Sequence, residues 1–178
     1  PAKGDKNMQT SRFDEVLENA NISRKDARYL TTNYRNTRQI ALTSKHFFTG
    51  PEYQLPKIPE RIGDLPQIQP KETESLMKRI ANHSINLPRK KFGVIVDRYE
   101  DRKAFHNGIN KFAGKTIAQS WYGGSKKKVD FVSNGVIVLT HHNIKGLEFD
   151  YLYICKLNNW RLNSNNIGKQ KLYTLCAR

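Results

Sequence analysis

Two stretches of this chain concentrate side chains that could bind phosphate or nucleic acid. Residues 30–40 read Leu-Thr-Thr-Asn-Tyr-Arg-Asn-Thr-Arg-Gln-Ile and place an aromatic ring, Tyr34, beside a guanidinium, Arg35. Residues 136–150 read Val-Ile-Val-Leu-Thr-His-His-Asn-Ile-Lys-Gly-Leu-Glu-Phe-Asp. Arginine is a permanently charged, bidentate donor to phosphate, and hydroxyl and imidazole groups contact phosphate or sugar without reading base sequence.

The histidines and cysteines do not predict a metal site. His141 and His142 are adjacent, so on a strand their side chains would point to opposite faces. Cys155 and Cys176 are the two cysteines, far apart and without a C-x-x-C pair. No further set of cysteine, histidine or carboxylate side chains completes a tetrahedral site. We therefore expect no metal, and reduced thiols in a cytoplasmic protein.

The tripeptide Gly114-Lys115-Thr116 has the ending of a phosphate-binding loop but not the rest of it. That loop needs a glycine five positions before Gly114, and the chain has Ile109 there. The loop must also leave a strand and enter a helix, whereas here a helix-like stretch precedes and a strand-like one follows. The chain offers no other candidate, so we expect that it does not hydrolyse a nucleotide alone.

Composition favours a basic globular domain. The 178 residues carry 31 Lys plus Arg against 16 Asp plus Glu, a net charge of +15, and 37% are hydrophobic. This excess favours a polyanion such as nucleic acid as a partner, although a basic domain without such a partner is the alternative. No apolar run approaches the roughly 20 residues that span a bilayer, and the first residues lack the design of a secretory signal, so we expect no membrane partner.

Hydrophobic periodicity predicts alternating strands and helices that would position these side chains. Continuous apolar runs predict buried strands, and helical spacing predicts amphipathic helices, one of which would turn Leu76, Ile80 and Ile85 inward. The expected strands are 29–34, 92–96, 116–121, 136–139 and 151–155, and the expected helices are 12–20, 36–48, 72–86 and 100–112. Five prolines and two glycines in residues 50–70 predict an irregular connection. The pattern indicates a parallel sheet covered on both faces, with ligands beyond the carboxyl ends of its strands.

The two stretches described first resemble motifs IV and V of the UvrD/Rep-like superfamily 1 helicases, L-x-x-N-Y-R-(S/N)-T and T-x-H-x-x-K-G-L-E-F. Residues 171–178, Lys-Leu-Tyr-Thr-Leu-Cys-Ala-Arg, resemble motif VI, with Ala177 where threonine is usual. Residues 4–9 resemble motif III, with the glutamine one place late. The resemblance implies an α/β, RecA-like (P-loop NTPase-type) lobe, domain 2A, without its own phosphate loop; Walker A and Walker B would lie upstream.

The resemblance also implies a domain plan. Residues 1–26 would hold the end of the motif III region and a linker helix, and residues 27–178 the second RecA-like lobe. Relatives often carry a large 2B insertion between motifs IV and V. Arg35 and Thr140 are only 105 positions apart (140 minus 35), so we expect no large 2B insertion.

The resemblance implies a role for each candidate residue. Tyr34 would stack on adenine, Glu148 would bind a ribose hydroxyl, and Gly146 would let the backbone approach the nucleotide closely. Arg35 and Arg178 would act as arginine fingers on the γ-phosphate, a contribution worth roughly 10³ to 10⁵ in rate elsewhere. Outside the motif, the same residues would be read as a core aromatic, surface ion pairs and an ordinary turn.

Three further residues complete the implied site. Lys145 would sense phosphate or simply remain solvated, and Thr140 and His142 would contact nucleic acid. The cofactor would be ATP with Mg²⁺, bound mainly by the N-terminal lobe. We expect single-stranded nucleic acid as the partner, with DNA favoured over RNA, although contacts to backbone and stacking surfaces do not distinguish the two. The rival hypothesis is a degenerate lobe that binds nucleic acid or protein without catalysis.

Overall fold

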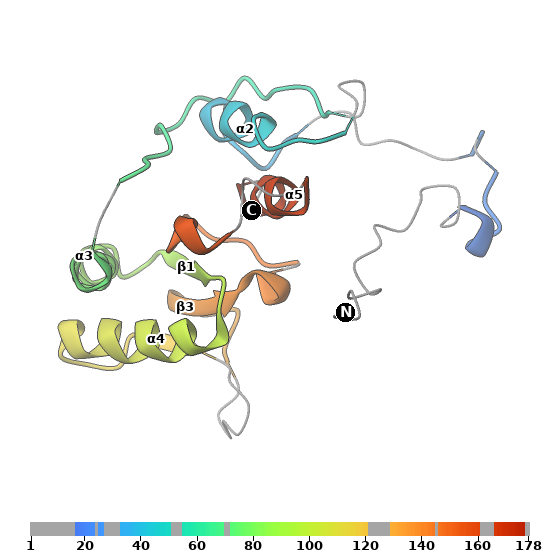
Figure 1. Ribbon diagram of the computed structural model, residues 1–178. Helices are drawn as coiled ribbons and strands as arrows, with labels where there is room; N and C mark the ends of the chain where they lie inside the picture. Colours follow the sequence, from blue (N-terminus) through green and yellow to red (C-terminus); the bar gives the residue numbers. More distant parts are fainter. Residues whose placement is uncertain are drawn as a thin grey trace.

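The described part of the chain forms a parallel β-sheet between two layers of helices. The structure, a computed structural model, describes residues 17–23, 25–26, 33–50, 55–69, 72–120, 129–144, 146–160 and 166–176. Within them, four parallel strands lie in the order β2-β3-β1-β4 (Figure 1). These strands are β1 (Lys91–Val96), β2 (Ala118–Ser120), β3 (Gly135–Thr140) and β4 (Tyr151–Ile154).

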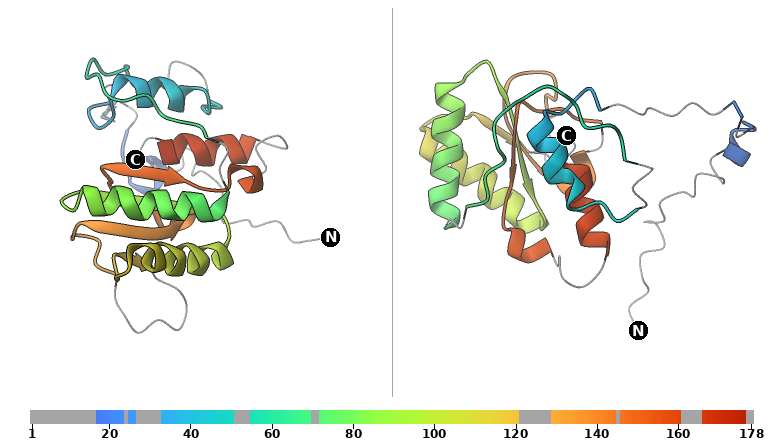
Figure 2. Two further views of the ribbon diagram at one scale, coloured as in Figure 1. Left: turned by 90° about the vertical axis from the view of Figure 1, so that its left-hand side faces the viewer. Right: turned by 90° about the horizontal axis from the view of Figure 1, so that it is seen from above.

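The helices divide between the two faces of the sheet. The α-helices are α2 (Arg38–Lys45), α3 (Thr73–Asn86), α4 (Tyr99–Ala113) and α5 (Asn166–Cys176), and the 3₁₀ helices are η3 (His141–Ile144) and η4 (Leu157–Trp160). Helices α3 and α4 cover one face, while α5, with α2 packed on it, covers the other (Figures 1 and 2). The prediction of a parallel sheet covered on both faces is confirmed.

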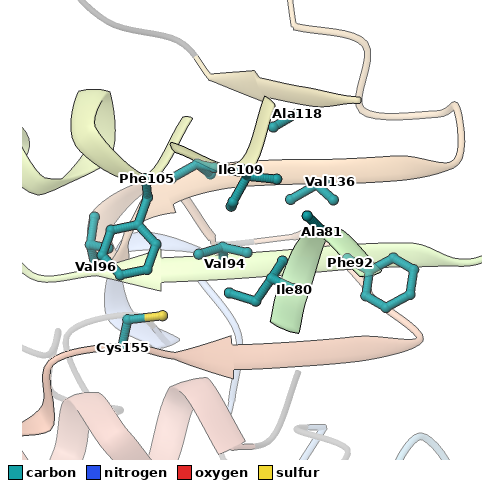
Figure 3. Packing of buried hydrophobic residues seen from close by; sticks show 11 residues of the cluster. Ile80, Ala81, Phe92, Val94, Val96, Phe105, Ile109, Ala118, Val136 and Cys155 are labelled. Atoms are coloured by element: carbon teal, nitrogen blue, oxygen red, sulfur yellow. The ribbon is translucent and has the colours of Figure 1, made fainter. Parts of the chain in front are cut away.

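Alternation along the central strands explains the two layers. Val94 and Val96 of β1 face α3 and α4, where they meet Ile80 and Phe105 (Figure 3). Ile95, between them, faces the opposite way into a second cluster with Leu172 and Leu175 of α5. Successive side chains of a strand point to opposite faces, so a continuous apolar run is buried on both.

The edges of the sheet depart from the sequence prediction. All four residues of β4 are only half-buried, because this strand pairs with β1 alone among the described residues. Ile85 is 40% exposed, so only Leu76 and Ile80 of the three predicted side chains of α3 contact the core. Asn33 and Tyr34 lie outside any strand, and residues 29–32 of the predicted strand lie outside the described residues.

Local signals place the remaining elements. Thr37 is the N-cap of α2, and its hydroxyl accepts a hydrogen bond from the Ile40 N–H at 3.5 Å. Residues 55–69 contain no helix or extended strand, in line with the predicted irregular connection. Residues 17–19 are helical, and the rest of the helix predicted from residue 12 lies outside the described residues apart from Ala20, in a turn.

Gly114 ends a helix and opens no phosphate cradle. It is the C-cap of α4, in the left-handed region at φ +66°, and β2 follows it. Glycine is favoured there because a side chain on a left-handed backbone is strained. The Asn110 side-chain oxygen accepts the N–H groups of Ile117 and Ala118, each at 2.8 Å, and so fixes the exit from this turn. The rejection of residues 114–116 as a phosphate loop agrees with this geometry.

No helix in the described ranges is both long enough and apolar enough to cross a bilayer.

Candidate functional site

The turn before α2 presents Tyr34 and Arg35 to solvent. The side-chain oxygen of Asn33 accepts the backbone N–H groups of Arg35 at 3.2 Å and Asn36 at 3.1 Å. Asparagine stabilises turns in this way because its short side chain reaches its own backbone two residues on. The Tyr34 ring is 84% exposed. Tyr34, predicted to end a strand, therefore lies on a turn that the Asn33 side chain stabilises.

Arg35 meets Glu148, although 113 positions separate them (148 minus 35). An Nη atom of Arg35 lies 2.6 Å from a carboxylate oxygen of Glu148, and the two side chains are 48% and 62% exposed. An ion pair this exposed contributes only about 0–1 kcal/mol to stability. The two groups are thus held together but remain accessible to a ligand.

The loop that carries Glu148 crosses the face of the sheet covered by α2 and α5. It leaves the carboxyl end of β3 after η3 and must return to the start of β4, which pairs with Phe92. On the way, the Phe149 ring packs over Gly93, where an added Cβ would lie 2.8 Å from ring carbons. Glu148 therefore lies in the loop that leads back to β4, next to Arg35 in the turn before α2. The sequence predicted a site beyond the carboxyl ends of the strands instead.

Two of the predicted ATP contacts, Lys145 and Arg178, lie outside the described residues. Gly146 is described, and its φ of +84° is the left-handed conformation that glycine adopts without strain. Nothing lies within 4 Å of the position that its Cβ would occupy. Glycine is therefore favoured at position 146 by the backbone conformation and not by crowding from neighbouring residues.

Thr140 and His142 lie at the carboxyl edge of the sheet. Thr140 is the last residue of β3, opposite Val96 of β1, and His142 follows it in η3. The expectation that His141 and His142 point to opposite faces is wrong. They lie in a 3₁₀ turn and not on a strand, so their ring centroids are only 3.7 Å apart. The side chain of His141 is buried, and His142 is exposed above it.

His141 is held as a neutral ring. Burial lowers its pKa from 6.5 to about 4, and the positive charge of Lys171 and the nearby His142 act in the same direction. The Trp160 ring lies 5.6 Å away, and an oxygen of Asp97 lies 3.6 Å from Nδ1. That distance is too long for a hydrogen bond, and with a neutral ring it is no ion pair. The sequence indicates this cluster around His141 only through the position of Asp97, directly after a buried strand.

Both cysteines are packing residues and not reactive thiols. Burial raises the pKa of the Cys155 thiol to about 12 and that of the Cys176 thiol to about 11. Both thiols therefore stay protonated near neutral pH, where only the thiolate is a good nucleophile or metal ligand. In the described residues, no three His, Cys, Asp or Glu side chains are placed to hold a metal ion.

Sequence reading missed Arg61, which lies in the irregular connection. Its guanidinium donates a hydrogen bond to the main-chain oxygen of Arg35. Its own main-chain oxygen accepts the N–H of Arg38 at 2.7 Å. No motif or periodicity marks this position, since its partners come from the folded path of the chain and from no local pattern.

Comparisons with known proteins bear on the fold. No protein-family model matches the sequence, and no curated protein matches it. Among solved structures, the crystal structure of the C-terminal domain of a possible DNA helicase from Lactobacillus plantarum WCFS1 matches with a TM-score of 0.55. The match covers 82% of this chain and 81% of that one at 22% identity. The chain thus has an α/β fold of the RecA-like kind, shared with that domain.

Proposed function

We propose that this chain is the second motor lobe of an ATP-dependent superfamily 1 helicase or translocase that acts on single-stranded nucleic acid, DNA rather than RNA. The observation that carries the proposal is the contact between Arg35 and Glu148. These residues come from the two stretches that resemble motifs IV and V, and both assigned roles require them beside one nucleotide. The RecA-like fold and the helicase description of the similar structure give further support.

The residues present fit a nucleotide held between two lobes. ATP with Mg²⁺ would be bound mainly by the N-terminal lobe and would supply the phosphoryl group. The guanidinium of Arg35 and that of Arg178 would reach the γ-phosphate and stabilise charge that develops there. The exposed Tyr34 ring would stack on adenine, and the Glu148 carboxylate would accept a hydrogen bond from a ribose hydroxyl. Gly146 would let the nucleotide approach the backbone closely, and Lys145 would place a positive charge near the phosphates.

The ion pair suggests how the two side chains could exchange partners. Arg35 and Glu148 pair with each other at little energetic gain. When the lobes close, Arg35 would exchange Glu148 for a phosphate oxygen, which leaves the carboxylate free for the ribose. Thr140 and His142, at the carboxyl edge, would hold the strand, so that closure moves this grip along the nucleic acid.

The test uses this lobe joined to an N-terminal lobe that carries a phosphate loop. We expect nucleic-acid-stimulated ATP hydrolysis by the joined protein, and weak ATP binding without turnover by the 178-residue chain. Arg35→Ala should lower kcat by about 10³-fold or more. Arg89→Ala is the matched control, because Arg89 is an exposed arginine in the turn before β1, and it should leave kcat unchanged.

Two outcomes would contradict the proposal. Full turnover by the Arg35→Ala protein would remove the assigned role of Arg35. Absence of any ATP hydrolysis by the joined protein, together with retained nucleic-acid binding, would support the rival hypothesis of a non-catalytic binding module.

A further inference from the structure

The segment after α2 doubles back across the turn that carries Arg35. We call residues 57–63 the strap; its return over α2 can be followed in Figures 1 and 2. Three backbone N–H groups donate hydrogen bonds that join the strap to the turn and to α2: Asn33 N–H to the Lys57 oxygen (3.4 Å), Arg38 N–H to the Arg61 oxygen (2.7 Å), and Gly63 N–H to the Gln39 side-chain oxygen (2.9 Å).

The strap packs closely against the start of α2. A Cβ on Gly63 would lie 2.4 Å from the Thr37 methyl carbon, nearer than any real contact. Thr37 is the N-cap of α2, so the strap contacts the residue at which the helix begins. The position of the strap and that of the turn are therefore fixed relative to each other.

Arg61 forms hydrogen bonds with residues on both sides of the N-cap residue, Thr37. Its main-chain oxygen accepts the N–H of Arg38, one of the first helical N–H groups, which have no partner within a helix. Its guanidinium donates to the main-chain oxygen of Arg35, which precedes the helix. A single residue thereby holds the backbone from Arg35 to Arg38, while the guanidinium of Arg35 itself remains turned to Glu148.

We propose that Arg61 is a positioning residue that fixes the backbone of Arg35 so that its guanidinium reaches the γ-phosphate. The inference rests on the proposed function. The Arg35 guanidinium stands at the end of a long, exposed side chain, so a small rotation of its backbone displaces the charged end further. Displacement of a catalytic group by about 1 Å can cost 10²-fold in rate.

The experiment compares Arg61→Met with Arg61→Lys in the joined two-lobed protein. Methionine keeps an unbranched side chain but removes the donor, whereas lysine keeps a donor for the Arg35 oxygen. We expect Arg61→Met to lower kcat by about 10- to 100-fold, with KM for ATP within about 2-fold, because the interaction matters in the transition state. Arg61→Lys should recover at least about a third of the wild-type kcat. Arg89→Met is the matched control and should have wild-type kinetics.

A double variant separates positioning from a general structural role. In an Arg35→Ala background, Arg61→Met should change kcat less than about 2-fold, because no guanidinium is left to position. Melting curves test whether each variant folds, and Arg61→Leu, which also lacks a donor, replaces Arg61→Met if the latter does not. A wild-type kcat for the folded Arg61 variant would overturn the inference. An equal loss with and without Arg35 would overturn it too.

The inference and the proposed function fail in different ways. If Arg35→Ala abolishes turnover but Arg61→Met does not reduce it, only the role of Arg61 is lost. If Arg35→Ala keeps full turnover, the proposed function fails, and the role of Arg61 fails with it.

Discussion

Arg35 and Glu148 show how exposed charges can be ready for a ligand without stabilising the fold. Both side chains are about half in solvent, and their pairing is worth about 0–1 kcal/mol at most. Losing this contact to a phosphate or a ribose therefore costs the protein little. A buried pair in the same place would resist the exchange, because breaking it leaves an uncompensated charge.

His141 makes the stability of the domain depend on pH. The folded state lowers its pKa from 6.5 to about 4, so between these values the unfolded chain binds more protons. The free energy of unfolding is unaffected by this histidine above pH 6.5 and falls as the pH drops towards 4, by about 3 kcal/mol.

Urea unfolding between pH 7.5 and 4 measures this loss. The variant His141→Leu should show a shallower decline than the wild type, because a leucine at this buried position takes up no proton. His46→Gln, at an exposed histidine at the end of α2, should leave the decline unchanged. Parallel declines in the wild type and His141→Leu would show that other groups carry the pH dependence.

At the scale of elements, one strand glycine decides how the loop with Glu148 crosses the sheet. Gly93 lies in the middle of β1, and a Cβ there would be 2.8 Å from both the Phe149 ring and Leu152. We expect Gly93→Ala to destabilise the fold by about 1–3 kcal/mol, as overpacking of a core does.

Gly108 provides the matched control for this prediction. It lies inside α4, and an added Cβ would meet only the flexible end of Met77, which can move. Alanine also favours a helix over glycine by about 0.5–1 kcal/mol. Gly108→Ala should thus be neutral or stabilising in the same unfolding assay. Equal losses for the two variants would show that the close approach over Gly93 is not the cause.

At the scale of the whole molecule, the net charge of +15 predicts salt-dependent binding. A protein that neutralises three or more phosphates of a single strand should lose about tenfold in affinity between 50 and 200 mM salt. Fluorescence anisotropy with a labelled oligonucleotide measures this loss. An affinity that does not vary with salt would exclude a phosphate-bound strand.

The same assay tests the carboxyl edge of the sheet. We expect His142→Ala to weaken binding a few-fold, because the exposed imidazole would contact a phosphate or a sugar of the bound strand. His46→Ala is the control. Unchanged affinity for His142→Ala would place the nucleic acid elsewhere on the lobe.

The layers of this protein can be predicted from its amino-acid pattern. Val94 and Ile95 lie in one apolar run, and burial on opposite faces follows from strand alternation. The cap at Thr37 and the end of α4 at Gly114 are also local signals, readable from a few neighbouring residues.

Contacts between residues far apart in the chain could not be predicted without the folded structure. The contact of Arg35 with Glu148, the hydrogen bond from Arg61 to Arg35 and the contact between the His141 and His142 rings depend on how the loops run over the sheet. Periodicity does not encode such paths, because an irregular segment has none. The partial burial of β4 also depends on the fold. Whether a strand lies at the edge or in the centre of a sheet follows from the strand order, which the apolar run of a single strand does not reveal.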